Sequence, residues 1–345
     1  MIFILLSLVS LLADTVYEGG RSVSGAFLAF LNSPDYAPAI VGAGDLVGSL
    51  LRLVTGLVAT AYASSTILWG FTIAGYALTA LSIPALALAG SWELAVMLYV
   101  LERVGKGLRA PSRDVILSEV TEKYGVGKAF GFHELLDQVG AFAGPLLVAS
   151  LIAVSGYRAA FAALLIPGAI AIALIIISAR LYPSIKSVGK REDGGLALRL
   201  GAGFWWFAAG IGLLSLGFMH WAIASYYLYS YEGIPASEIG FIYAIAMAVD
   251  AVVAVPMGAL FDRHGIKVLY ILPASSFLFA LLLLNAPREA ALALAIPWGL
   301  VMSAEESILR ASVVKLVAPE RRAAAFGIYS IIFGGFWAIG GALYS

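Results

Sequence analysis

Cysteine is absent from all 345 residues of the sequence, and charged residues are scarce. The absence of thiols excludes disulfide bridges, thiolate metal sites and cysteine nucleophiles. Asp, Glu, Lys and Arg make up 12% of the chain, whereas a soluble domain carries about a quarter. The mean hydropathy is +0.96. These values predict an all-α polytopic membrane protein.

The sequence patterns of several enzyme classes are also missing. There is no G-x-x-x-x-G-K-[ST] loop for nucleotide hydrolysis, and neither H-E-x-x-H nor G-x-S-x-G occurs. We therefore predict that the protein is not an enzyme, needs no cofactor and binds no nucleic acid.

Eleven stretches are long and apolar enough to cross a bilayer, which takes about 20 residues of helix. The first is too long for a cleavable signal peptide and lacks a small-residue cleavage site, so it is predicted to span the membrane. Turn-forming segments such as NSPD and YEGIPASE separate the stretches. The predicted spans are 3–31, 36–61, 66–89, 92–111, 128–154, 158–181, 201–230, 237–261, 266–286, 290–314 and 323–344.

The distribution of Lys and Arg predicts the orientation, because cytoplasmic loops are rich in these residues. With a cytoplasmic N-terminus in the plasma membrane, most of them fall in or beside cytoplasmic loops, and only Arg158 and Arg288 lie on the opposite side. The cytoplasmic set is Lys106, Arg109, Arg113, Lys123, Lys128, Arg180, Lys186, Lys190, Arg191, Arg199, Arg263, Lys267, Lys315, Arg321 and Arg322.

An internal repeat divides the chain. The segment AFGFHELLDQVGAFAG (129–144) matches AFGIYSIIFGGFWAIG (325–340), and RDVILSEV (113–120) matches RASVVKLV (310–317). We predict a six-helix bundle (1–181), a cytoplasmic linker (182–200) and a bundle of five helices (201–345). A twelfth helix is expected but missing, which indicates either a truncated product or a dispensable last helix. Repeats of this kind are typical of secondary transporters, whose substrate site lies between the halves.

Three short motifs carry physical expectations. In GALFDRHG (258–265), Gly258 allows close helix approach, Asp262 can cap or pair at a helix end, and Arg263 can bind a carboxylate of a neighbouring helix. The alternative is that Asp262 and Arg263 only anchor the cytoplasmic end of the helix. In RVGKGLRAPSRD (103–114), Arg103 is either functional or snorkels to the interface. In GAFAGP (140–145), small residues and a proline favour close packing and a bend.

Together these motifs resemble those of the major facilitator superfamily. GALFDRHG is similar to its loop signature G-x-x-x-D-R-x-G, Arg103 and Gly107 to its R-x-x-x-G motif, and GAFAGP to its G-x-x-x-G-P motif. The resemblance implies a two-bundle fold and transport, with Arg103 linked to proton coupling and the third motif to antiport. The first half departs from the pattern, since Thr60 and Ala61 stand where Asp and Arg are expected. The motif residues predicted to control gating are Gly258, Asp262, Arg263, Gly107, Arg113, Glu134, Asp137, Gly140, Gly144 and Pro145.

Charged residues inside the predicted spans indicate candidate functional sites. A charge at the centre of a membrane costs roughly 2.5–3.5 kcal/mol and tends to be functional. Asp14, Glu18 and Arg21 share one helix face. The resemblance implies that helices 1, 4, 7 and 10 line a central cavity. The residues predicted to line it or to couple protons are Asp14, Glu18, Arg21, Arg103, Glu305, Glu306 and Arg310.

Intrahelical pairing is the plainer alternative for some of these charges. Glu18 with Arg21, and Glu306 with Arg310, have i,i+3 and i,i+4 spacing. Arg52 can likewise pair with Asp45. A metal site at His133 and Asp137 is disfavoured, because two ligands on one face are too few.

Aromatic residues crowd the seventh span. Those near its ends fit an interfacial belt, while others are candidates for contact with an organic solute. The predicted substrate contacts are His220, Trp221, Tyr226 and Tyr227.

Two functions follow from these observations. The first is a monomeric, proton-coupled secondary transporter of a small solute that works by alternating access, with the helix-5 motif favouring export. The second is a non-transporting membrane sensor or defective carrier, which the missing twelfth helix and the lost first-half Asp-Arg pair favour.

Overall fold

The computed structural model describes residues 1–62, 64–121, 126–185, 200–285, 287–318 and 322–345, and these are helical almost throughout. Short helices of other types follow or join the α-helices: η1 (Leu86–Leu88), η3 (Gly265–Tyr270), η4 (Arg288–Leu294) and η5 (Glu305–Leu309). The α-helices are α1 (Ile2–Ser22), α2 (Ser24–Phe30), α3 (Ala37–Tyr62), α4 (Ser65–Ala85), α5 (Trp92–Thr121), α6 (Val126–Ala163), α7 (Leu165–Leu181), α8 (Ala202–Gly217), α9 (Trp221–Ser230), α10 (Ala236–His264), α11 (Ile271–Asn285), α12 (Ala295–Ala304), α13 (Arg310–Leu316) and α14 (Arg322–Tyr344).

Eight stretches of the described chain are long and apolar enough to cross a membrane. Two of them, Phe132–Leu181 and Ala236–Asn285, are 50 residues long, about twice the length of one crossing, and each contains two predicted spans. Within the first, Gly156 has a φ of 77° and interrupts the helical backbone where the sequence predicts a turn. The span predicted at 92–111 forms α5, which carries several charges and is not one of the eight.

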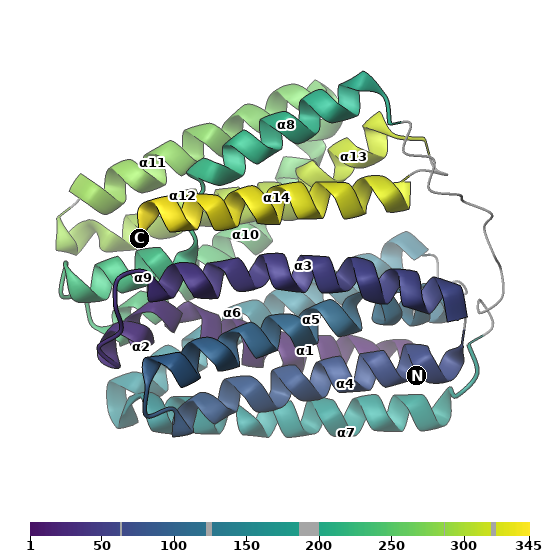
Figure 1. The fold of residues 1–345 in the computed structure, drawn as a ribbon, viewed down its shortest axis with the longest axis horizontal. Helices are drawn as coiled ribbons and strands as arrows, with labels where there is room; N and C mark the ends of the chain where they lie inside the picture. The colour runs from purple at the N-terminus through teal and green to yellow at the C-terminus, as the bar shows by residue number, and fades with distance from the viewer. Residues whose placement is uncertain (63, 122–125, 186–199, 286, 319–321) are drawn as a thin grey trace.

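The helices form two groups that lie side by side (Figure 1). One group contains α1 and α3 to α7, and the other contains α8 and α10 to α14. We refer to residues 1–181 as the first half and to residues 201–345 as the second half. The halves touch most extensively through α6 with α10, α3 with α14, and α2 with α9, and α1 also contacts α9 and α10.

Three of the predicted spans that the resemblance assigns to the cavity are interrupted along their length. The first breaks at Val23, between α1 and α2. The seventh breaks between α8 and α9, where His220 is the N-cap of α9. The tenth contains the π-helical turn η5. Interruptions of this kind are common at functional sites in membrane helices.

The repeat has a direct structural counterpart in two glycine residues. A Cβ added at Gly144 in α6 would lie 2.2 Å from the carbonyl oxygen of Thr15 in α1. A Cβ added at its repeat partner Gly340 in α14 would lie 2.3 Å from the carbonyl oxygen of Leu216 in α8. Each half therefore packs its first helix against the same position of the repeat.

We expect Gly144→Val to destabilise the protein by about 1–3 kcal/mol, because the added atoms force α1 and α6 apart. The free energy of unfolding in detergent micelles measures this effect. Gly258→Val is the matched control, since a Cβ at Gly258 meets nothing within 4 Å. Equal stability of the two variants would contradict the expectation.

Candidate functional site

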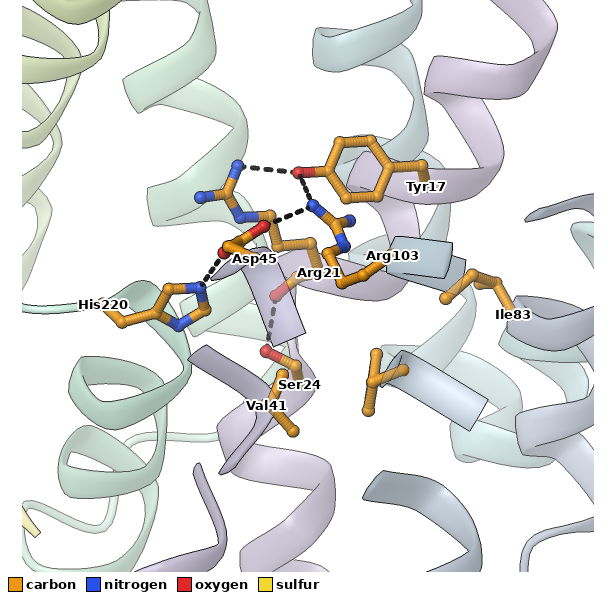
Figure 2. Close-up of a pocket in the computed structure, with 9 residues that line it drawn as sticks. Tyr17, Arg21, Ser24, Val41, Asp45, Ile83, Arg103 and His220 are labelled. Carbon is orange, nitrogen blue, oxygen red and sulfur yellow. Dashed lines mark hydrogen bonds and ion pairs between the residues drawn. The ribbon is translucent and has the colours of Figure 1, made fainter. Parts of the chain in front are cut away.

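A small cavity lies between the helices of the first half and the break in the seventh span (Figure 2). Its volume is about 20 Å³, on the scale of one or two water molecules. It contains several ionisable groups, and His220 is its single contribution from the second half. The lining residues are Tyr17, Arg21, Ser24, Val41, Asp45, Ile83, Tyr99, Arg103 and His220.

The Tyr17 side chain joins the two arginine residues of the cavity. Its hydroxyl oxygen accepts hydrogen bonds from Nη1 of Arg21 at 3.0 Å and from Nη1 of Arg103 at 2.8 Å (Figure 2). The Arg103 guanidinium also lies 3.9 Å from the centre of the Tyr17 ring, and the Lys106 ammonium lies 4.3 Å from it. Cations at these distances are attracted by the electron-rich ring face.

Arg103 is buried and has carboxylates on two helices. It donates to Asp45 on α3 at 2.9 Å and forms an ion pair with its neighbour Glu102. Two alternatives that the sequence left open are therefore wrong. Arg103 does not snorkel to the interface, and Asp45 pairs with Arg103 rather than with Arg52. The geometry explains this outcome, since α3 packs along α5 and brings Asp45 and Arg103 together.

His220 connects this network to the second half. Its Nδ1 accepts a hydrogen bond from the backbone N–H of Ala222 at 3.1 Å, and its Nε2 lies 3.1 Å from Oδ2 of Asp45. Because Nδ1 acts as an acceptor, the ring proton lies on Nε2 and is donated to Asp45. Gly42 leaves room for the ring, since a Cβ there would lie 3.1 Å from Cγ of His220.

Glu18 makes a second connection between the halves. Its Oε2 accepts a hydrogen bond of 2.6 Å from the hydroxyl of Tyr243 on α10. Its Oε1 lies 3.6 Å from Nη1 of Arg21, so the intrahelical pair expected from the i,i+3 spacing does form. Both Glu18 and Arg21 are 8% exposed.

A further buried group lies behind the cavity and was not anticipated from the sequence. Arg109 donates to the hydroxyl of Thr79 at 2.5 Å, and Thr79 donates to Oε1 of Glu102 at 3.2 Å. Arg109 lies on the same helix as Arg103 and is 3% exposed. The position of Arg109 in an apolar helix could have indicated its burial, but the distribution of Lys and Arg assigned Arg109 to a cytoplasmic loop.

The acidic residues of the tenth span are arranged differently from expectation. Glu306 accepts a hydrogen bond of 3.3 Å from Gln138 of α6. It forms no ion pair with Arg310, which is exposed, so the expected i,i+4 pair is wrong. The π-helical turn η5 begins at Glu305 and changes the angle between side chains four residues apart.

The other predicted coupling residues have few partners. Within the described ranges, Asp14 and Glu305 make no hydrogen bond or ion pair through their carboxylates. In α6, Glu134 is exposed, and Asp137 lies 3.6 Å from Nε2 of His133. In the part of the chain that the structure describes, no group of three or more His, Asp or Glu residues could hold a metal ion.

The GALFDRHG segment does not form the contacts that its sequence suggests. Asp262 and Arg263 are exposed and have no hydrogen bond or ion pair among the described residues. The expectation that Gly258 allows close helix approach is wrong, because nothing lies within 4 Å of a Cβ built there. The residue with a conformational requirement is Gly265, whose φ of 63° ends α10.

The remaining motif residues pack helices together or make contacts with their neighbours in the chain. A Cβ at Gly107 would lie 2.6 Å from the carbonyl oxygen of Gly48 in α3. Gly140 packs in the same way on Leu11 of α1, at 2.2 Å. Arg113 donates two hydrogen bonds to Asp114. Pro145 lies inside α6, directly after the glycine pair.

Three of the four predicted substrate contacts lie outside the cavity, and only His220 lines it. Trp221 is fully buried, and its indole donates to the carbonyl oxygen of Ser22 at 2.7 Å. The Tyr226 hydroxyl donates to Asp35 at 2.9 Å, and the Tyr227 ring stacks on another tyrosine. In this conformation their polar groups and ring faces are used in protein contacts, which sequence patterns could not show.

Comparison with known proteins identifies the family. A sequence model described as Major Facilitator Superfamily matches residues 3–342. The chain belongs to the major facilitator superfamily. The motif resemblance is thereby confirmed, as is the prediction of an all-helical, multi-pass membrane fold. The protein is a transporter of a small-molecule substrate rather than an enzyme.

Relatives of this superfamily member occur in bacteria and archaea. An uncharacterised protein of Mycobacterium tuberculosis is 38% identical over 347 residues, which cover 97% of this chain and 83% of the relative. An uncharacterised MFS-type transporter of Methanocaldococcus jannaschii is 40% identical over 77 residues, which cover 22% of this chain and 19% of the relative.

Solved structures share the fold. A mutant form of the nucleoside transporter NupG has a TM-score of 0.78 at 15% identity, over 99% of this chain and 90% of that one. A POT family transporter in complex with 5-aminolevulinic acid has a TM-score of 0.77 at 12% identity, over 99% and 89% of the two chains. At these identities the likeness concerns the fold alone.

Proposed function

We propose that the protein is a proton-coupled secondary transporter that moves a small solute by alternating access. The two halves rock about the cavity around Tyr17 and Arg103 as two bodies, 1–181 and 201–345. The Lys and Arg distribution supports an orientation with the N-terminus in the cytoplasm of the plasma membrane. The protein works as a monomer, since one chain supplies both sides of the cavity.

The observation that carries the proposal is the contact of Glu18 with Tyr243. It joins α1 of the first half to α10 of the second through a 2.6 Å hydrogen bond to a buried carboxylate. An ionised Glu18 accepts a charge-assisted hydrogen bond from Tyr243 and attracts Arg21, whereas a protonated Glu18 accepts only a weaker, neutral hydrogen bond and loses most of its attraction to Arg21. Proton binding therefore changes the contacts that hold the halves together, which is the coupling that a proton-driven carrier requires.

The direction of transport stays a prediction. The glycine residues of the helix-5 motif, Gly140 and Gly144, pack α6 closely on α1. Close helix packing serves import and export equally well, and it serves cotransport and antiport equally well. Export and antiport therefore rest on the sequence motif.

We expect Glu18→Gln to abolish solute accumulation driven by a pH gradient while solute exchange at equal pH continues. The amide keeps the size of the side chain and cannot take up a proton. Uptake of a library of labelled solutes into proteoliposomes, with and without an imposed gradient, measures the effect. Glu93→Gln is the matched control, because Glu93 is exposed at the start of α5.

Gradient-driven uptake that is unchanged in Glu18→Gln would make Glu18 a structural partner of Arg21. An absence of flux for every solute, in the unchanged protein, would favour the non-transporting sensor.

A further inference from the structure

The Arg21 guanidinium is buried beside the cavity with most of its hydrogen-bonding capacity unused. Arg21 is 8% exposed and lines this cavity. Its Nη1 donates to Tyr17, but its Nε has no partner and no access to solvent. The Glu18 carboxylate lies 3.6 Å away, too far for a hydrogen bond, and is held by Tyr243 instead.

The other cavity arginine shows the contrast. Arg103 makes two hydrogen bonds and has ion pairs to Glu102 and Asp45. A buried guanidinium donor without an acceptor costs about 1–3 kcal/mol or more, so such a donor in a cavity indicates a missing acceptor.

A second cation near the cavity also lacks an ion-pair partner, which favours an anion as that acceptor. Lys106 makes no ion pair within 4.0 Å in the described ranges, and its ammonium rests over the Tyr17 ring. Four cations adjoin the cavity or its Glu102 branch: Arg21, Arg103, Lys106 and Arg109. Of the nearby carboxylates, Glu18, Asp45 and Glu102 form ion pairs with them, and Asp14 interacts with Lys106 and Arg109 without an ion pair in the described ranges.

We propose that Arg21 binds the carboxylate of the transported solute, so that the substrate is a small organic acid. The planar guanidinium fork matches a carboxylate and binds it through two parallel hydrogen bonds. Val41, Ile83 and the ring of Tyr99 line the same space and offer an apolar wall for the organic part. The space is smaller than such a solute, so binding occurs as the halves move apart. This inference rests on the proposed transport function and names its substrate class.

Glu18 connects this site to proton binding. The solute carboxylate and the Glu18 carboxylate share the Arg21 cation, and each weakens the attraction of the other for it. Protonation of Glu18 removes this competition, so proton binding and acid binding strengthen each other. That linkage produces cotransport of a proton with the acid, and it argues against exchange of the two.

The test is equilibrium binding to the purified full chain in detergent, without any gradient. The probes are matched acid and amide pairs, hexanoate with hexanamide and benzoate with benzamide, together with inorganic phosphate and chloride. Tryptophan fluorescence reports binding, because the Trp337 ring centre lies 4.9 Å from that of His220. We expect the acids to bind at least about tenfold more tightly than their amides.

Three variants and one control separate the roles. Arg21→Gln removes the preference for the acid, and Arg21→Lys, which keeps the charge without the fork, retains part of it. Glu18→Gln imitates the protonated carboxyl and tightens acid binding. Arg180→Gln is the control, because Arg180 is exposed at the end of α7. Thermal unfolding of each variant shows whether it is folded. If Arg21→Gln does not fold, the reduced acid preference of Arg21→Lys tests the role of the guanidinium.

Equal binding of acids and amides, or no binding of either, would overturn the proposal. So would an acid preference that survives in Arg21→Gln. Phosphate or chloride binding as tightly as the acids would make this a site for an inorganic anion instead. The outcome is independent of proton coupling. Acid-selective binding without gradient-driven flux would support the binding site and contradict the proposed transport function. Gradient-driven flux of neutral solutes would support the transport function and contradict the binding site.

Discussion

Replacement of Gly25 by valine is expected to reduce solute transport to less than about a tenth of the unchanged level. Gly25 lies on α2 of the first half and faces α9 of the second. A Cβ there would lie 1.8 Å from the carbonyl oxygen of Ala222 and 2.4 Å from the backbone nitrogen of Tyr226. Both atoms belong to the backbone, so the clash is relieved only if the two helices separate.

The contact of α2 with α9 closes one end of the molecule through hydrogen bonds as well as packing. The backbone N–H of Ala26 donates to the hydroxyl of Ser225 at 3.0 Å. The indole of Trp221 donates to the carbonyl oxygen of Ser22 at 2.7 Å. Overpacking costs about 1–3 kcal/mol, and about 1.4 kcal/mol lowers the population of the closed state tenfold. A carrier that cannot close this end cannot complete its cycle.

Uptake into proteoliposomes measures the loss, and thiol labelling measures its cause. The chain has no cysteine of its own, so Ser225→Cys introduces a single thiol at a fully buried position. We expect a water-soluble maleimide to label it faster when Gly25→Val is also present. Gly70→Val is the matched control, since a Cβ at Gly70 in α4 meets nothing within 4 Å. Wild-type uptake by Gly25→Val would show that this contact does not have to form during transport.

Removal of the Arg103 side chain is expected to destabilise the protein by about 3–5 kcal/mol. Loss of one partner of a buried ion pair leaves an uncompensated charge, and the cost has this size. In Arg103→Ala, Glu102 is fully buried and, among the described residues, keeps Thr79 and the more distant Arg109 as partners. Asp45 would keep His220 as its single partner among those described.

The free energy of unfolding of Arg103→Ala in mixed micelles measures this cost. Arg180→Ala is the matched control and is expected to change stability by less than about 0.5 kcal/mol, because Arg180 is exposed. A double-mutant cycle with Asp45→Ala isolates the Arg103–Asp45 interaction. If Arg103→Ala and the control are equally stable, the ion pairs seen around Arg103 contribute nothing to the folded state.

The sequence by itself determined the class of protein, the position of the spans and the family. Each of these depends on local information. A run of about 20 apolar residues identifies a membrane helix because a single crossing has that length, and motifs such as GALFDRHG lie in contiguous residues. The Glu18–Arg21 pair was also predictable, because three residues of helix fix its geometry.

Only the tertiary structure decided which charges are partners. Asp45 and Arg103 are 58 residues apart in the chain, and Glu18 and Tyr243 are 225 apart. These contacts depend on how α3, α5 and α10 pack, which periodicity within one helix does not encode. The π-helical turn that begins at Glu305 shows the same limit on a smaller scale, because the sequence does not predict it and the possible i,i+4 pair of Glu306 with Arg310 does not form across it. The composition of a membrane helix favours burial and pairing of its charges, whereas packing selects the pairs and leaves Arg21 with an unpaired donor.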